Sequence, residues 1–239
     1  MLITTNAIVL SKLKYKDNDL IVKCYTQEIG SVSFLVRGVL KSKKGSSKAA
    51  YFQVLSQLQI VFTHKNTTSL QSVKETKSNG VYTSLHSHVL KGSIVMFLSE
   101  VLSNTLQEEE ENQILYSYLE NTLLWLDSQS EYSNFHLLFL LKLTRYLGFQ
   151  PGNLNNNYSY FNLESGVFET SNKGIYSIDG ENLILLKRLL GINFDTLNGI
   201  KINGKQRRDF LNMLLYYFEL HLGGFKKPKS LQVLNDVFH

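Results

Sequence analysis

Lysines alternate with apolar and aromatic side chains near the start of the chain, as in the run Lys12-Leu13-Lys14-Tyr15-Lys16. An ammonium group neutralises a phosphate, and an aromatic ring stacks on a nucleic-acid base. Residues of these two types in close succession therefore favour noncovalent binding of a polyanion over the making or breaking of bonds.

The positive charge of the chain is concentrated in its first third. Residues 1–80 hold 12 Lys or Arg against 4 Asp or Glu, a net charge of +8, whereas the other 159 residues hold 13 against 16, a net charge of −3. Clustered positive charge releases counterions from a nucleic-acid backbone on binding. This asymmetry predicts one part that meets a polyanion and a near-neutral part that meets proteins.

The candidate binding residues follow from this charge distribution. The side chains predicted to contact phosphates are Lys14, Lys16, Lys23, Arg37, Lys41, Lys43, Lys44 and Lys48. Tyr15 and Tyr25 lie among them and are the candidates for stacking on bases. Lys205, Arg207 and Arg208 begin a later helix and are predicted to form a second phosphate-facing patch.

The elements that must position the first set are β-strands. From Asn6 to Lys77 the apolar residues recur mostly at every second position, as in Leu20, Val22 and Cys24, which share one face. Cys24 is therefore expected in the core as a small hydrophobe. A strand is also expected from Val54. Five short strands predict a small barrel, and the OB-fold is the natural candidate, so residues 1–80 are assigned to an OB-fold nucleic-acid-binding domain.

From about Leu85 the apolar period becomes helical. Helices are expected near residues 90–102, 114–126 and 134–147, from 181 onward, and near 205–222 and 229–238. The acidic run Glu108–Glu111 is expected at the beginning of the second helix, where the helix dipole favours anions. Residues 149–180, rich in Asn, Ser and Gly, form an irregular insertion with short β pieces. The class is therefore α+β, with a mainly helical domain at residues 81–239.

The sequence contains no complete motif for catalysis or for binding a metal or a cofactor. The run Gly199–Lys205 matches the first seven positions of a P-loop, but Gln206 stands where Ser or Thr coordinates magnesium, so a loop ending in a helix is expected. The six histidines have no metal-binding spacing. We predict a protein that is not an enzyme and has no cofactor or metal.

The cellular setting follows from two further features. A single cysteine allows no intramolecular disulfide and fits a reducing cytoplasm. The start of the chain has no basic region before an apolar stretch, and the apolar runs are too short to span a membrane. A cytoplasmic protein without a membrane partner is expected.

Several short runs follow one another in a distinctive order: Asn6–Leu10, Tyr15–Asp19, Tyr25–Thr26 with Gly30, and Val36–Val39 before a loop of Lys and Ser. With the run Lys229–Leu234 near the other end, they resemble the bacterial RecO family of recombination mediators. The resemblance implies a DNA repair factor that binds single- and double-stranded DNA and anneals complementary strands. It also implies that the protein acts with RecR to load RecA onto DNA coated by single-strand-binding protein, at the nucleoid during repair.

Two further expectations come from this resemblance. The helical domain is expected to capture the acidic C-terminal tail of single-strand-binding protein, for which Lys142 and Arg145 beside Phe149 are the candidate residues. Many family members carry a four-cysteine zinc site in the segment that matches residues 149–180, and this chain has no cysteine there. An apolar cluster is expected in its place, formed by Tyr158, Tyr160, Phe161 and Phe168.

Three other functions remain open on the sequence. One is a protein-only adaptor, in which the barrel is a structural platform. Another is an RNA-binding OB protein, which fits the same charge and aromatic residues. The third is an ATP-dependent enzyme, which depends only on the imperfect P-loop run.

Overall fold

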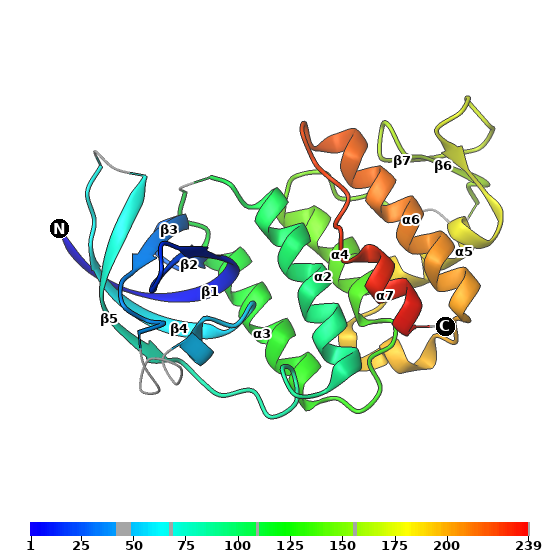
Figure 1. The fold of residues 1–239 in the computed structure, drawn as a ribbon. Coiled ribbons are helices and arrows are strands. Elements are labelled where there is room, and N and C mark those ends of the chain that lie inside the picture. The colour runs from blue at the N-terminus through cyan, green and yellow to red at the C-terminus, as the bar shows by residue number, and fades with distance from the viewer. Residues whose placement is uncertain (42–48, 67–68, 109, 155–156, 239) are drawn as a thin grey trace. The chain divides into compact units, whose positions relative to one another are not determined.

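A computed structural model of the chain describes residues 1–41, 49–66, 69–108, 110–154 and 157–238. These fall into two compact units. Unit 1 comprises Met1–Ser128 with Pro228–Leu231, and unit 2 comprises Gln129–Lys227 with Gln232–His239. Unit 1 holds a barrel and two helices, and unit 2 holds further helices and a small sheet (Figure 1). The predicted α+β class, with a five-stranded OB-like barrel ahead of helices, is confirmed.

Five strands close the barrel in the order β1-β2-β3-β5-β4. They are β1 (Leu2–Tyr15), β2 (Asp19–Thr26), β3 (Gly30–Val36), β4 (Gln57–Thr63) and β5 (Leu70–Ser78). The long strand β1 pairs with β4 along its first half and with β2 along its second half. All pairings are antiparallel except that of β3 with β5, which is parallel and short.

The barrel core is filled by the alternate side chains of these strands. Val22 and Cys24 are fully buried, as their period-two spacing predicts, and Phe34 packs edge-on against Phe62 with ring centroids 5.0 Å apart. The strand predicted from Val54 begins instead at Gln57. The reason is Leu55, which has a positive φ of 61° and is buried, so the chain turns there before β4 begins.

Two helices complete unit 1, and α2 packs against β1. These helices are α2 (Val89–Thr105) and α3 (Gln113–Ser128). Between β3 and β4 lies the short 3-10 helix η1 (Ala50–Phe52). In the part of the chain that the structure describes, every helix is too short or too polar to cross a lipid bilayer.

Unit 2 is built on three helices that pack on one another, α4, α5 and α6. Its elements are α4 (Phe135–Tyr146), β6 (Tyr160–Asn162), β7 (Val167–Glu169), β8 (Ser177–Ile178), α5 (Gly180–Leu190), η2 (Phe194–Gly199), α6 (Gly204–His221) and most of α7 (Leu231–Val237). The three strands form a small sheet in the order β7-β6-β8, which lies within the predicted insertion.

Glu108 and Glu110 of the acidic run before α3 lie against the barrel, and the helix begins after the run. The N–H of Ser31, at the start of β3, donates to the main-chain oxygen of Glu108 at 3.0 Å. Gly30 has a φ of +77°, and a Cβ added there would lie 2.8 Å from that same oxygen. Helix α3 begins only at Gln113, after Asn112, whose side-chain oxygen accepts the N–H of Leu115.

Asp127, near the end of α3, holds the connection between the barrel and α2. Its carboxylate accepts the N–H groups of Thr83, Ser84 and Leu85, each at 2.8 Å. The ammonium group of Lys91 donates to the main-chain oxygen of Asp127 at 2.8 Å. Partial burial acts to raise the pKa of Asp127, but the backbone donors outweigh it and lower the pKa to about 2.

The Asp127→Ala variant is expected to lower the free energy of unfolding of unit 1 by about 1 to 2 kcal/mol, because three N–H groups lose their acceptor. Because the pKa of folded Asp127 is below its ordinary value of 3.8, this contribution is present above about pH 4 and is lost as the pH falls towards 2. The single tryptophan, Trp125, lies in α3, so its fluorescence reports the unfolding of unit 1. Asp17→Ala, which removes an exposed carboxylate, is the control, and an equal loss there would contradict the assignment.

Candidate nucleic-acid interface

The hairpin of β1 and β2 brings part of the predicted phosphate-contacting set together. Lys14 pairs with Leu20 across the hairpin, and Leu20 pairs on its other side with Val36 of β3. Arg37 follows Val36 directly and therefore leaves the barrel beside the same hairpin. Residues that are more than twenty positions apart in the sequence are thus neighbours at one end of the barrel.

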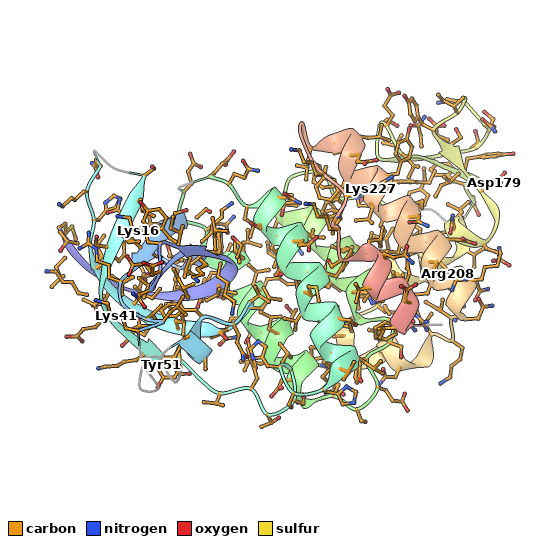
Figure 2. The ribbon with its side chains drawn as sticks, in the orientation of Figure 1. Lys16, Lys41, Tyr51, Asp179, Arg208 and Lys227 are labelled. Carbon is orange, nitrogen blue, oxygen red and sulfur yellow. The ribbon has the colours of Figure 1, made fainter. Side chains whose placement is uncertain are left out.

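Two hydrogen bonds tie the segment after β3 to the hairpin turn. The N–H of Gly38 donates to Oδ1 of Asp19 at 2.7 Å, and the N–H of Leu40 donates to the main-chain oxygen of Asn18 at 3.0 Å. They keep Lys41 at this end of the barrel. We define the hairpin-end cluster as the exposed side chains Lys14, Tyr15, Lys16, Arg37 and Lys41 (Figure 2 labels Lys16 and Lys41).

The hairpin-end cluster has a positive field and an accessible ring. Lys16 has a φ of 52°, which suits a tight turn, and its Nζ lies 5.4 Å from the centroid of the Tyr15 ring. Tyr15 is 38% exposed. The acidic side chains of the turn are Asp17 and Asp19, and the second of these already accepts a backbone N–H. Four cations against two carboxylates leave this end attractive to an anion.

Two residues of the predicted set have other roles within unit 1, and we leave them out of the proposed interface. Lys23 is partly buried, and its Nζ donates to the main-chain oxygen of Ser103 at 2.9 Å, so it joins β2 to the end of α2. Burial lowers the pKa of Lys23. Tyr25 is only 3% exposed, and burial raises its pKa to about 12. A ring that is buried in this way has no face to offer a base.

The remaining lysines fall into two groups. Lys43, Lys44 and Lys48 belong to the predicted set but lie outside the described residues. Lys74 and Lys77 are exposed on β5 and were missed by the sequence analysis. They were missed because no aromatic residue lies close to them in the sequence.

The run that resembles a P-loop is a helix cap. Gly199 ends η2 and Gly204 begins α6, so the segment between them follows a helical turn and not a strand. The N–H of Gln206 donates to Oδ1 of Asn203 at 2.9 Å, and the N–H of Asn203 donates to Oε1 of Gln206 at 3.1 Å. This reciprocal pair is a capping box, which explains why Gln is present there. The expected loop ending in a helix is confirmed.

Two family models match the chain and together cover almost all of it. Residues 1–82 match the family described as Recombination protein O N terminal, and residues 86–232 match Recombination protein O C terminal. The chain belongs to the RecO family. The first match covers the barrel with its hairpin-end cluster, and the second begins just before α2.

Relatives within the RecO family are similar over their whole length. The DNA repair protein RecO of Christiangramia forsetii is 51% identical, that of Flavobacterium psychrophilum 42% and that of Bacteroides fragilis 37%, each aligned over 100% of both chains. Membership of the RecO family places the chain among proteins of DNA repair and recombination, and the OB-like barrel agrees with that assignment.

The predicted second basic patch of this RecO family member consists of Lys205, Arg207 and Arg208. Arg207 is partly buried, and its guanidinium donates to Oδ1 of Asn134 at 3.1 Å and to the main-chain oxygen of Phe238 at 3.3 Å. Lys205 pairs with Asp209 at 3.0 Å, and Arg208 stays partly exposed. Arg207 therefore stabilises unit 2, and we leave it out of the phosphate-binding set.

The residues predicted to bind the tail of single-strand-binding protein are only partly brought together. Lys142 and Arg145 line a hollow of about 70 Å³ between α4 and α5. Nζ of Lys142 donates to Oδ1 of Asn193 at 3.2 Å, and burial and then Arg145 lower the pKa of Lys142. Phe149 is not part of this hollow. Its ring stacks on His221 with centroids 5.1 Å apart, and we therefore separate it from the two cations.

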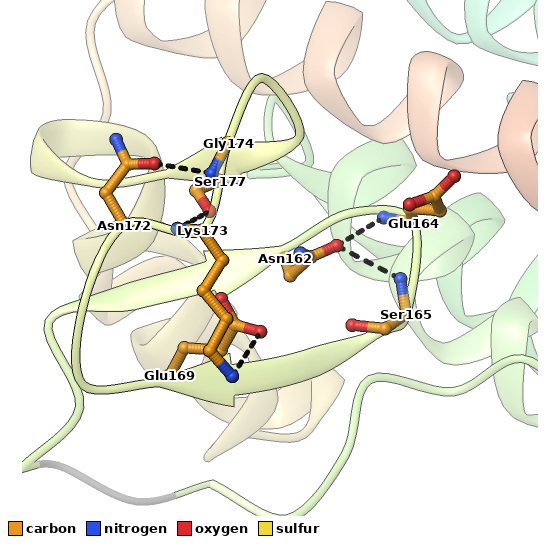
Figure 3. Close-up of polar contacts among 8 residues, drawn as sticks. All are labelled: Asn162, Glu164, Ser165, Glu169, Asn172, Lys173, Gly174 and Ser177. Atoms are coloured by element: carbon orange, nitrogen blue, oxygen red, sulfur yellow. Dashed lines mark hydrogen bonds and ion pairs between the residues drawn. The ribbon is translucent and has the colours of Figure 1, made fainter.

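The insertion is held by its own turns and by an ion pair (Figure 3). Oδ1 of Asn162 accepts the N–H groups of Glu164 at 3.0 Å and of Ser165 at 3.1 Å, which closes the turn between β6 and β7. Lys173 pairs with Glu169 of β7 at 3.3 Å. These contacts fix the loops of the small sheet by hydrogen bonds within the chain.

The apolar side of the same sheet agrees in part with the expected cluster. Phe161 and Phe168 are buried with ring centroids 4.9 Å apart, whereas Tyr158 and Tyr160 are only partly buried. Among the residues that the structure describes, no group of three or more His, Cys, Asp or Glu is placed to hold a metal. The single cysteine, Cys24, is buried in the barrel, so the insertion of this RecO family member does not fit the family's zinc site.

Proposed function

We propose that this RecO family chain is a non-catalytic mediator of recombinational DNA repair that binds single- and double-stranded DNA through the hairpin-end cluster. The observation that carries the proposal is the gathering of four exposed cations and one exposed ring at one end of an OB-like barrel. Such a cluster binds the backbone of any sequence, because every phosphate carries the same charge.

Strand annealing follows from the same surface. Two complementary strands repel each other through their phosphates, and cations that neutralise both strands reduce this repulsion. The proposed role of the hairpin-end cluster is therefore to let two strands approach closely enough to form base pairs.

The proposed partners come from the RecO resemblance. The chain acts with RecR to load RecA onto DNA coated by single-strand-binding protein, in the bacterial cytoplasm at the nucleoid. Unit 2 receives the acidic tail of the coating protein. Lys142 and Arg145 line one hollow, which supports this role because ammonium and guanidinium groups donate hydrogen bonds to carboxylates. Their hollow of about 70 Å³ suits a carboxylate better than an aromatic anchor.

The salt dependence of binding tests the proposal directly. If the four cations of the hairpin-end cluster each neutralise one phosphate, the logarithm of the affinity for single-stranded DNA falls with the logarithm of salt concentration at a slope of about −3 or steeper. Fluorescence anisotropy of a labelled oligonucleotide over a salt series measures this slope. A flat response would remove the electrostatic basis of the proposal.

Function is tested by annealing of complementary oligonucleotides that have been coated with the cognate single-strand-binding protein. We expect the chain to accelerate annealing of the coated strands. Acceleration of bare but not coated strands would separate DNA binding from partner binding. A matched RNA strand is the control for an RNA-binding protein, and failure to bind either nucleic acid would favour a protein-only adaptor.

A further inference from the structure

A groove opens in the barrel wall where β3 and β5 separate. Their parallel pairing extends only from Ser33 and Leu70 to Leu35 and Ser72. Beyond Ser72, β5 continues to Ser78 paired on its other side with β4, while β3 ends at Val36. The space between them, with η1 beside it, has a volume of about 440 Å³.

Adjacent aromatic residues of η1 line this groove in different ways. Phe52 is 2% exposed and belongs to the barrel core, so it is fixed in place. Tyr51, the residue before it, is 42% exposed (labelled in Figure 2). A tyrosine side chain has only two rotatable χ angles and loses little conformational freedom on binding, which makes Tyr51 a suitable platform for a flat ligand.

The charged residues that line the groove are mostly cations. Arg37, Lys74 and Lys77 are exposed along it, against one carboxylate, that of Glu75. Arg37 also belongs to the hairpin-end cluster, so the groove continues from the surface proposed to bind the DNA backbone. The excess of positive charge favours a ligand with phosphates.

The combination of ring, cations and volume matches a single nucleotide of a nucleic-acid strand. The groove volume lies within the range of about 300 to 1,000 Å³ that small-molecule sites have. A base that stacks on an aromatic side chain must first leave its neighbours in the strand, which costs little in a single strand and more in a duplex.

We propose that this groove binds one unstacked nucleotide of single-stranded DNA, with its base on Tyr51 and its flanking phosphates beside Lys74 and Lys77. The inference rests on the proposed function and adds to it a preference for single strands over duplexes. The hairpin-end cluster follows the backbone of either form, and the groove accepts only a base that is free to turn outward.

Replacement of Tyr51 tests the stacking contact. Tyr51→Ala is expected to weaken binding of a fluorescein-labelled oligo-dT by about 5- to 100-fold, because one stacked base is lost. The affinity for a labelled duplex DNA is expected to change by less than about twofold. Tyr51→Phe keeps the ring and is expected to bind oligo-dT like the unmodified chain.

The control is Tyr216→Ala, which removes a tyrosine of similar exposure, 38%, from α6 in unit 2. It is expected to leave the affinity for oligo-dT unchanged. Joint replacement of Lys74 and Lys77 by Ala is expected to make the salt slope for oligo-dT less steep by about 1.4. Trp125 fluorescence confirms that each variant in the barrel is folded.

The outcomes separate this inference from the proposed function. If the unmodified chain binds neither oligo-dT nor duplex, both are overturned. If it binds both and Tyr51→Ala binds oligo-dT equally well, the groove proposal is overturned and the hairpin-end proposal stands. Equal losses for oligo-dT and duplex, or equal losses in Tyr51→Ala and Tyr51→Phe, also overturn the groove proposal, because they exclude a stacked, unpaired base.

Discussion

A variant with Lys14, Lys16 and Lys41 all replaced by Glu is expected to bind single-stranded DNA about 100-fold more weakly than the unmodified chain at 0.1 M salt. Each phosphate contact of a single strand changes affinity about fivefold for a tenfold change in salt concentration, so the loss of three contacts multiplies to this size. Arg37 is left in place because it also lines the groove. Anisotropy of a labelled oligonucleotide measures the loss.

A second triple variant is the control for the change in net charge. Arg188, Lys201 and Lys226 are exposed and belong to unit 2, and their replacement by Glu changes the net charge equally. This control is expected to lose far less affinity, and an equal loss would mean that net charge and not the hairpin-end cluster governs binding. Exposed charges contribute little to folding, so both triple variants are expected to unfold near the temperature of the unmodified chain.

Gly30→Ala is expected to lower the free energy of unfolding of unit 1 by about 2 to 5 kcal/mol. Two effects add at this position. The φ of +77° is unfavourable for any residue with a Cβ, and that Cβ would press on the backbone of Glu108 and Glu110. Backbone atoms cannot rotate away as a flexible side chain does. Denaturant unfolding followed by Trp125 fluorescence measures the loss.

Gly38→Ala is the matched control for this variant. Gly38 also has a positive φ, +65°, but the nearest atom to an added Cβ is Cδ of Lys41 at 3.7 Å, which is an ordinary contact. The control is expected to lose only about 1 kcal/mol, from backbone strain alone. Equal losses in the two variants would show that the contact between the acidic segment and the barrel adds nothing to stability.

The sequence was sufficient to predict the barrel, because a half-buried strand shows its inward face in every second residue. Val22 and Cys24 are buried as predicted, and the helical period places α4 and α6 within about two residues of their observed ends. The capping box at Asn203 was not predicted, although its two residues, Asn203 and Gln206, are only three positions apart in the sequence.

What the sequence did not predict are contacts between residues that are far apart in the chain. Lys23 has the residue type and the strand position of a phosphate ligand, yet its partner is the carbonyl of Ser103, and a main-chain oxygen has no sequence signal. In the same way, the guanidinium of Arg207 donates to the main-chain oxygen of Phe238, which also has no sequence signal. The groove at Tyr51 depends on where two parallel strands diverge, which neither strand encodes alone.

The return of the chain to unit 1 has a consequence for biosynthesis. Pro228–Leu231 belong to unit 1, where the N–H of Ser230 donates to Oε2 of Glu100 at 3.2 Å, although nearly all of unit 2 lies between them and α3 in the sequence. Unit 1 of a nascent polypeptide therefore stays incomplete until Pro228–Leu231 have left the ribosome. The final assembly of unit 1 therefore depends on the synthesis of nearly the whole chain. Products that terminate before residue 228 lack the last segment of unit 1.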